Sequence, residues 1–111
     1  MKLDIKWVKT LYTIYRVIYQ KKVILEGREK EGVICYSKSL FRISTRNSLL
    51  HQLETIMHEY YHAIFTELEI EPLEEREVNA LSRSLVKFIQ ENSELVKIIL
   101  EHKGEEVNAK V

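Results

Sequence analysis

The chain has 111 residues, with 17 basic and 17 acidic side chains and a formal net charge of zero. This length suits one domain, and the balanced charge disfavours binding to nucleic acid or to an anionic membrane by bulk electrostatics. With 45% hydrophobic and 31% charged residues, the composition is that of a globular protein rather than a disordered one. We therefore expect a single domain over 1–103, followed by a flexible tail at 104–111.

The cysteine content and the charge also bear on cellular setting and assembly. Cys35 is the only cysteine, so the chain can form no internal disulfide, and a reducing cytoplasm is its natural setting. No apolar run approaches the roughly 18 residues of a membrane-spanning helix, and the first residues lack the apolar core of a signal peptide. Zero net charge leaves little repulsion between copies, so we expect a cytoplasmic protein that is able to form a homo-oligomer.

The first part of the chain carries short apolar patterns. Residues 3–20 have apolar side chains at helical spacing, which predicts an N-terminal helix, although the β-branched and aromatic residues near its end would also suit a strand. Three apolar runs follow, at 23–25, 32–36 and 40–43, separated by polar segments containing Gly or Ser. They predict a small three-stranded antiparallel sheet, which needs a helix on one face to be stable.

The second part of the chain has longer helical patterns. An amphipathic helix is predicted over about 47–68, and Pro72 suits the first position of a second helix, whose early glutamates are favourable near its positive end. Asn92-Ser93 should interrupt that helix, with Ser93 as the N-cap of a last helix to about 103. The predicted fold class is α+β. The second helix is expected to point a set of apolar residues inward: Val78, Leu81, Leu85, Phe88 and Ile89.

An HExxH motif, His58-Glu-Tyr-Tyr-His62, lies in the long helix. Positions i and i+4 share one helix face, about 6 Å apart, so both imidazoles can bind one metal ion, for which zinc is the default. Glu59 projects about 60° further round the helix, where it would act on a metal-bound water as a general base without binding the metal. Both histidines point away from the apolar stripe. The alternative is a pair of exposed histidines on a polar face with no metal.

A catalytic zinc has three protein ligands and one open position, so a third ligand must come from elsewhere. The second helix is preceded or opened by four glutamates, and a helical hairpin bent at Pro72 would bring them back toward the histidines. Periodicity alone does not choose among them, and each is also an ordinary acidic helix start. The four candidates are Glu71, Glu74, Glu75 and Glu77.

The segment 54–65, followed by Glu75-Arg-Glu-Val-Asn79, resembles the gluzincin metallopeptidases, in which a "glutamate helix" with E-x-x-x-D or E-x-x-x-N follows HExxH. The resemblance covers the residue pattern over about 54–89 and the layout of most of the chain. Length and layout are most similar to the minimal-scaffold group of minigluzincins and selecase-like archaeal proteins, and more distantly to ImmA/IrrE-type peptidases. It implies that Glu75 is the third zinc ligand, with Glu74 as the fallback, and that Asn79 bonds to His58 and fixes its tautomer and ring angle.

The resemblance also implies a cleft. The third predicted strand would form its upper rim and pair with an extended substrate, as in β-augmentation. Latency in the resembled minimal group implies autoinhibition, with the tail at 104–111 or a neighbouring subunit occupying the cleft. The tail offers Glu105, Glu106 and a terminal carboxylate as possible zinc ligands, and the alternative is a tail that is merely disordered. The residues of that strand are Leu40, Phe41, Arg42, Ile43 and Ser44.

The expected function is zinc-dependent hydrolysis of peptide bonds in a peptide or protein substrate, with one Zn²⁺ on His58, His62 and Glu75 and with Glu59 as the base. One tyrosine could also steady an oxyanion, and the sequence does not choose among Tyr36, Tyr60 and Tyr61. The alternative function is a non-catalytic binding module, in which the same metal holds two helices together or a partner binds the sheet edge. Structural zinc sites usually have four ligands and are rich in cysteine, which favours the catalytic interpretation.

Overall fold

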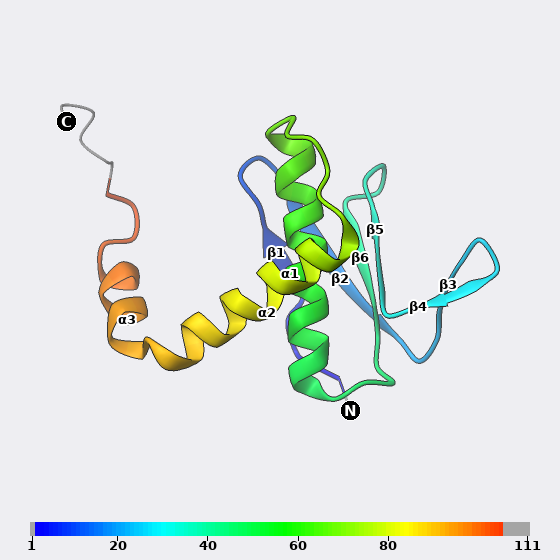
Figure 1. Cartoon of the computed structure of the whole chain (residues 1–111), viewed down its shortest axis with the longest axis horizontal. Helices are drawn as coiled ribbons and strands as arrows, with labels where there is room; N and C mark the ends of the chain where they lie inside the picture. Colours follow the sequence, from blue (N-terminus) through cyan, green and yellow to red (C-terminus); the bar gives the residue numbers. More distant parts are fainter. Residues whose placement is uncertain (1, 106–111) are drawn as a thin grey trace.

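A mixed four-stranded sheet with one long helix on one face forms the body of the protein, as a computed structural model describing residues 2–105 shows (Figure 1). The strand order is Trp7–Lys9 (β1), Ile14–Gln20 (β2), Leu40–Ser44 (β6) and Gly32–Cys35 (β5). Strand β2 is antiparallel to β1 and parallel to β6, and β6 is antiparallel to β5. Val23–Leu25 (β3) and Arg28–Lys30 (β4) form a separate hairpin.

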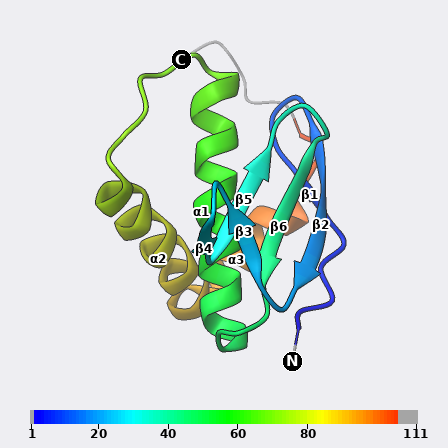
Figure 2. The same cartoon turned by 90° about the vertical axis from the view of Figure 1, so that its right-hand side faces the viewer.

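The three helices are Leu49–Glu67 (α1), Glu75–Glu91 (α2) and Ser93–Glu101 (α3). Helix α1 lies along one face of the sheet, and α2 crosses its outer side (Figures 1 and 2). The core lies between α1 and the sheet, where the rings of Tyr15 and Phe41 stack with centroids 4.8 Å apart. In the described part of the chain, no helix combines the length and apolar character needed to cross a membrane.

The predicted N-terminal helix over 3–20 is wrong, because this segment contains β1 and β2. In β2 the side chains alternate, with Tyr15 and Val17 buried against α1 and with Ile14 and Arg16 exposed on the other face. The β-branched and aromatic side chains suit a pleated surface, and pairing with β6 along five residues fixes the extended form.

The predicted three-stranded antiparallel sheet is also wrong, both in which strands form it and in their relative orientation. Its runs at 32–36 and 40–43 do pair antiparallel as β5 and β6, but the run at 23–25 pairs with β4 in the hairpin. Its place beside β6 is taken by β2, which runs parallel to β6. The α+β class is therefore confirmed, with a larger sheet than predicted.

The helices lie close to their predicted positions, with different starts. Helix α1 begins after Ser48, whose hydroxyl accepts a hydrogen bond from the His51 backbone N–H. Helix α2 begins at Glu75 rather than Pro72, because the backbone N–H of Glu74 donates to the Glu77 carboxylate in a capping box. The residue that caps α3 is Asn92, not Ser93.

Helix α2 leaves the body after its first turns, and α3 extends further from it (Figure 1). Val78 is fully buried, as predicted, but three of the residues predicted to face inward are 37–45% exposed. The prediction failed because it assumed that the body extends along the whole of α2. The three residues are Leu81, Phe88 and Ile89.

Candidate metal centre

Two histidines of α1 and the first residue of α2 bring three metal-binding atoms together. One ligand atom each from His58, His62 and Glu75 lies within 4.8 Å of the others. The two Nε2 atoms are 3.0 Å apart, and the Glu75 carboxylate lies 2.9 Å from that of His58 and 3.1 Å from that of His62. The HExxH histidines and the expected third ligand therefore converge, and no other such group of at least three residues occurs in the described part of the chain.

The start of α2 selects Glu75 over Glu74. The Glu74 carboxylate accepts a hydrogen bond from a backbone N–H in the first turn and lies 3.4 Å from Arg76 Nε. Glu74 is not among the residues whose ligand atoms converge, whereas Glu75 contacts both histidines. The fallback ligand of the sequence analysis is thus a capping residue.

Asn79 lies one turn further along α2, where its Oδ1 is 2.8 Å from His58 Nδ1. An amide oxygen only accepts hydrogen bonds, so Nδ1 carries the proton, and the Nε2 of a neutral imidazole then presents a lone pair. That lone pair faces a Glu75 carboxylate oxygen at 2.9 Å. Two acceptors at this distance need a proton or a metal ion between them.

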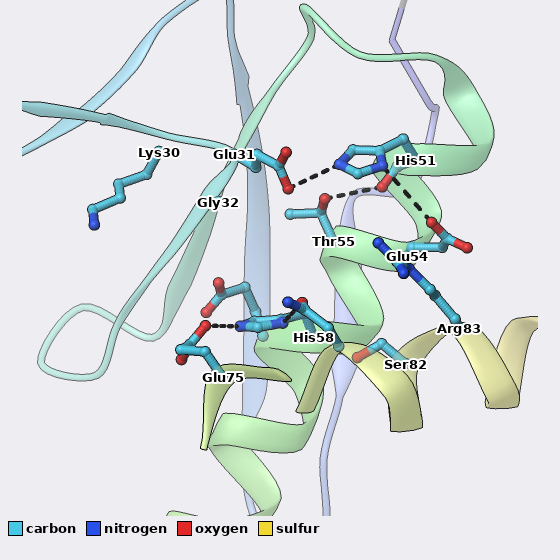
Figure 3. A pocket seen from close by; sticks show the side chains of 12 residues that line it. Lys30, Glu31, Gly32, His51, Glu54, Thr55, His58, Glu75, Ser82 and Arg83 are labelled. Carbon is cyan, nitrogen blue, oxygen red and sulfur yellow. Dashed lines mark hydrogen bonds and ion pairs between the residues drawn. The ribbon is translucent and has the colours of Figure 1, made fainter. Parts of the chain in front are cut away.

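The donor set fits zinc. Two nitrogens bound at about 2.0–2.1 Å in tetrahedral geometry lie about 3.3 Å apart, close to the observed separation of 3.0 Å. Burial and the neighbouring His58 lower the pKa of His62, against a smaller opposing effect of Glu75, which favours the neutral, metal-binding form. Figure 3 shows the Glu75 carboxylate pointing toward His58 from the opposite helix.

Glu59 lies beside the cluster without belonging to it. Its side chain is almost fully buried, and this burial, aided by the Glu75 carboxylate, raises its pKa from 4.5 to about 8. The group can therefore exchange a proton near neutral pH, as a general base or acid must.

A pocket of about 300 Å³ adjoins the cluster (Figure 3). It extends along α1 toward the start of that helix, with the β4–β5 corner on one side and α2 on the other. Sequence reasoning missed most of its lining, because the pocket forms from three segments that are distant in sequence. Its lining residues outside the cluster are Lys30, Glu31, Gly32, His51, Glu54, Thr55, Glu59, Asn79, Ser82 and Arg83.

The strand predicted as the upper rim is not at an edge. Residues Leu40–Ser44 pair with β2 on one side and with β5 on the other, so β6 has no free backbone groups to pair with a substrate. The edge strand on this side of the sheet is β5, and no strand in the described residues pairs with its outer side. The rim prediction is therefore wrong for Leu40, Phe41, Arg42, Ile43 and Ser44, which lie one strand further in.

Strand β5 rests on α1 at both ends. A Cβ atom on Gly32 would lie 2.5 Å from Thr55 Cγ2, so the first residue of the strand approaches α1 as closely as a glycine allows. Just beyond the other end, the Tyr36 hydroxyl donates to the backbone oxygen of His62 at 3.4 Å and accepts from Thr66 Oγ1 at 3.1 Å. Of the three tyrosines considered for an oxyanion, Tyr36 is thus the one whose hydroxyl contacts the HExxH segment.

The expected tail begins at Gly104, and only its first two residues are described. Glu105 pairs with His102, the residue that follows α3. Helix α3 lies away from α1 and from the start of α2 (Figure 1). Residues 106–111, including Glu106, lie outside the described residues.

In comparisons with known proteins, no family model, curated protein or solved structure matches this chain.

Proposed function

We propose that this protein is a zinc-dependent hydrolase. The observation that carries the proposal is the convergence of His58, His62 and Glu75 on one point. Asn79 holds the His58 ring so that its Nε2 lone pair faces the Glu75 carboxylate there. Three protein ligands from two helices leave one coordination position open, which is characteristic of catalytic rather than structural zinc. Within that class, the HExxH motif and the glutamate on the next helix favour a gluzincin-type metalloendopeptidase.

Each residue has a role that its position supports. Bound zinc would supply a Lewis acid that polarises a carbonyl and lowers the pKa of a coordinated water. With a metal ion on the three ligands, the pKa of the nearby Glu59 would be lower, because the positive charge of the ion offsets the charge of Glu75. The Glu59 carboxylate could then accept a proton at neutral pH. Glu59 would return that proton to the leaving amine.

The free edge of β5 suits an extended peptide. Its backbone groups run over α1 from Gly32, beside Thr55, toward Tyr36, beside His62. A substrate paired with this edge would cross the cluster with its backbone fixed by strand hydrogen bonds. The substrate-binding strand of this proposal is therefore β5, in place of β6.

The test combines metal analysis with a cleavage assay. We expect purified protein to bind one zinc per chain and to cleave a denatured protein substrate, with cleavage lost on addition of a chelator. Glu59→Gln should retain zinc and lose hydrolysis, whereas Glu54→Gln, five residues earlier on α1, should retain both. Undiminished hydrolysis by the Glu59 variant would refute the mechanism.

The alternative is a non-catalytic module in which the metal holds α1 and α2 together. It is supported by the shallow packing of α2, in which Val78 and Ser82 are the buried residues. This alternative predicts zinc binding and zinc-dependent stability without any cleavage, so the same assay separates the two functions.

A further inference from the structure

The pocket beside the metal centre has an end that the proposed chemistry does not use. His51 lies seven residues before His58 on α1, and Arg83 lies eight residues after Glu75 on α2, which are about 10 and 12 Å of helix, respectively. Figure 3 shows the Arg83 side chain pointing back toward His51 and Glu54. The two helices thus form a groove with the metal ligands at one end and Arg83 at the other.

The acidic side chains at this far end already have a partner. His51 lies between two carboxylates, with its Nε2 2.8 Å from Glu31 and its Nδ1 3.7 Å from Glu54. The Nε2 contact is close but lacks the alignment of a hydrogen bond. The imidazole nevertheless occupies the space between the two acids and joins the β4–β5 corner to α1.

Arg83 has no such partner. Among the described residues, its guanidinium makes no hydrogen bond or ion pair, although it lines the pocket. The other arginine of α2, Arg76, lies outside the pocket and contacts Glu74 at 3.4 Å. A guanidinium in a polar pocket presents a planar fork of donors that matches a carboxylate.

We propose that Arg83 forms a carboxylate-binding subsite, which makes the enzyme select peptides with a carboxylate near the cleaved bond. This proposal rests on the proposed peptidase function and adds a substrate class to it. The carboxylate belongs either to an acidic side chain or to the C-terminus of a short peptide. Both present the same two oxygens to the guanidinium.

The direction of β5 places this carboxylate on the C-terminal side of the cleaved bond. Strand β5 begins at the pocket with Gly32 and ends toward Tyr36, near His62. A substrate in the commoner antiparallel pairing would therefore lead its C-terminal residues into the pocket. Because an extended chain advances about 3.3 Å per residue, a distance of about 10 Å corresponds to two or three residues beyond the bond.

The test uses zinc-loaded protein and peptides whose cleavage site has first been mapped by mass spectrometry. The residue two or three positions after the bond is varied among Glu, Gln and Lys, and each peptide is made with a free or an amidated C-terminus. We expect kcat/KM to be about tenfold or more higher with a carboxylate present, and this preference to vanish in Arg83→Gln. A preference for the Glu side chain or for the free terminus identifies the source.

Three variants control this result. Arg76→Gln removes the same charge from α2 outside the pocket and should leave the preference unchanged. Glu54→Gln removes a repelling charge and should strengthen it. Arg83→Lys, which keeps the charge without the planar fork, should retain only part of it. An Arg83→Gln enzyme with wild-type selectivity, or a wild-type enzyme that favours Lys, would overturn the subsite.

A binding measurement separates failure of the subsite from failure of the peptidase function. Zinc-loaded Glu59→Gln protein is titrated with the Glu and Gln peptides, and the dissociation constants are compared with those of the same protein carrying Arg83→Gln. Tighter, Arg83-dependent binding of the Glu peptide supports the subsite even if no peptide is cleaved. Equal binding of both peptides would reject it.

Discussion

Asn79 determines which ring nitrogen of His58 faces the proposed metal position. Its amide oxygen lies 2.8 Å from Nδ1, which leaves Nε2 directed at Glu75 and His62. Removal of this bond frees the ring and the tautomer, so Asn79→Ala should weaken zinc binding by about 10–100-fold. Competition with a chromophoric chelator measures the affinity. Asn79→Asp should retain it, and so should Asn92→Ala, which removes an amide from the far end of α2.

Glu59 should make the metal-free protein less stable as pH rises. Burial raises its pKa in the folded state to about 8, above the unfolded value near 4.5, so the folded state binds more protons between these values. The contribution of protonated Glu59 to the free energy of unfolding is complete below pH 4.5 and is lost as pH rises through about 8. The free energy of unfolding falls by at most about 1.4 kcal/mol per pH unit in this range.

Urea denaturation in chelator at pH 5 and pH 8 tests this effect. The free energy of unfolding should fall more between these pH values in the wild type than in Glu59→Gln, which has no ionisable group at this position. The difference between the two proteins isolates Glu59 from the other titrating groups. A parallel pH dependence in both would show that Glu59 does not titrate in this range.

At the scale of elements, the contact between β5 and α1 depends on a missing side chain. Gly32→Ala would place a methyl group 2.5 Å from Thr55 Cγ2 and should lift the strand from the helix, with a loss of about 1–3 kcal/mol in stability. Thr55→Ser removes Cγ2 and keeps the hydroxyl that bonds to the His51 carbonyl. The double variant should therefore be more stable than the sum of the single changes predicts, as a thermal or urea double-mutant cycle would show. Simple additivity would contradict a direct contact.

The elements that could be predicted from the sequence are those specified locally. Helix α1 carries its apolar stripe, its Ser48 cap and its HExxH motif within one segment, so its limits were predicted to within two residues. The segment 3–20 has an apolar spacing compatible with both periodicities, and its strand form depends on pairing with β6, more than 20 residues away. Local patterns contain no information on that partner.

The candidate site divides in the same way. His58, Glu59 and His62 follow from one motif, and the resemblance supplied Glu75 and Asn79. The groove needs the β4–β5 corner and the third turn of α2, so Gly32 and Arg83 carried no local signal. The face of α2 that contains Glu75 and Asn79 also contains Arg83 at the next i+4 step, so Arg83 could have been identified from the assignment of Glu75 as the expected ligand.

On the scale of the whole molecule, α2 and α3 form an arm that makes the protein elongated, with extents of 51 × 30 × 25 Å. Four apolar residues of α3 are 46–64% exposed on this arm, and the chain carries no net charge to oppose association. We expect concentration-dependent self-association in analytical ultracentrifugation. Leu100→Glu should shift the protein toward monomer, whereas Lys97→Glu, a charge change on the same helix, should not. The four residues are Leu95, Ile98, Ile99 and Leu100.

Zinc should also stabilise the whole molecule, because its ligands join the arm to the body. Glu75 is the first residue of α2 and the two histidines lie on α1, so a metal ion would join the two helices close to the segment that connects them. Zinc at 100 times its dissociation constant should add about 2.7 kcal/mol to the free energy of unfolding and raise the midpoint of thermal unfolding. Amide hydrogen exchange in 75–91 should slow at the same time. Glu75→Ala should abolish both effects, and Glu59→Gln should preserve them, because Glu59 contributes no ligand. A zinc-induced shift that survives loss of Glu75 would place the metal elsewhere.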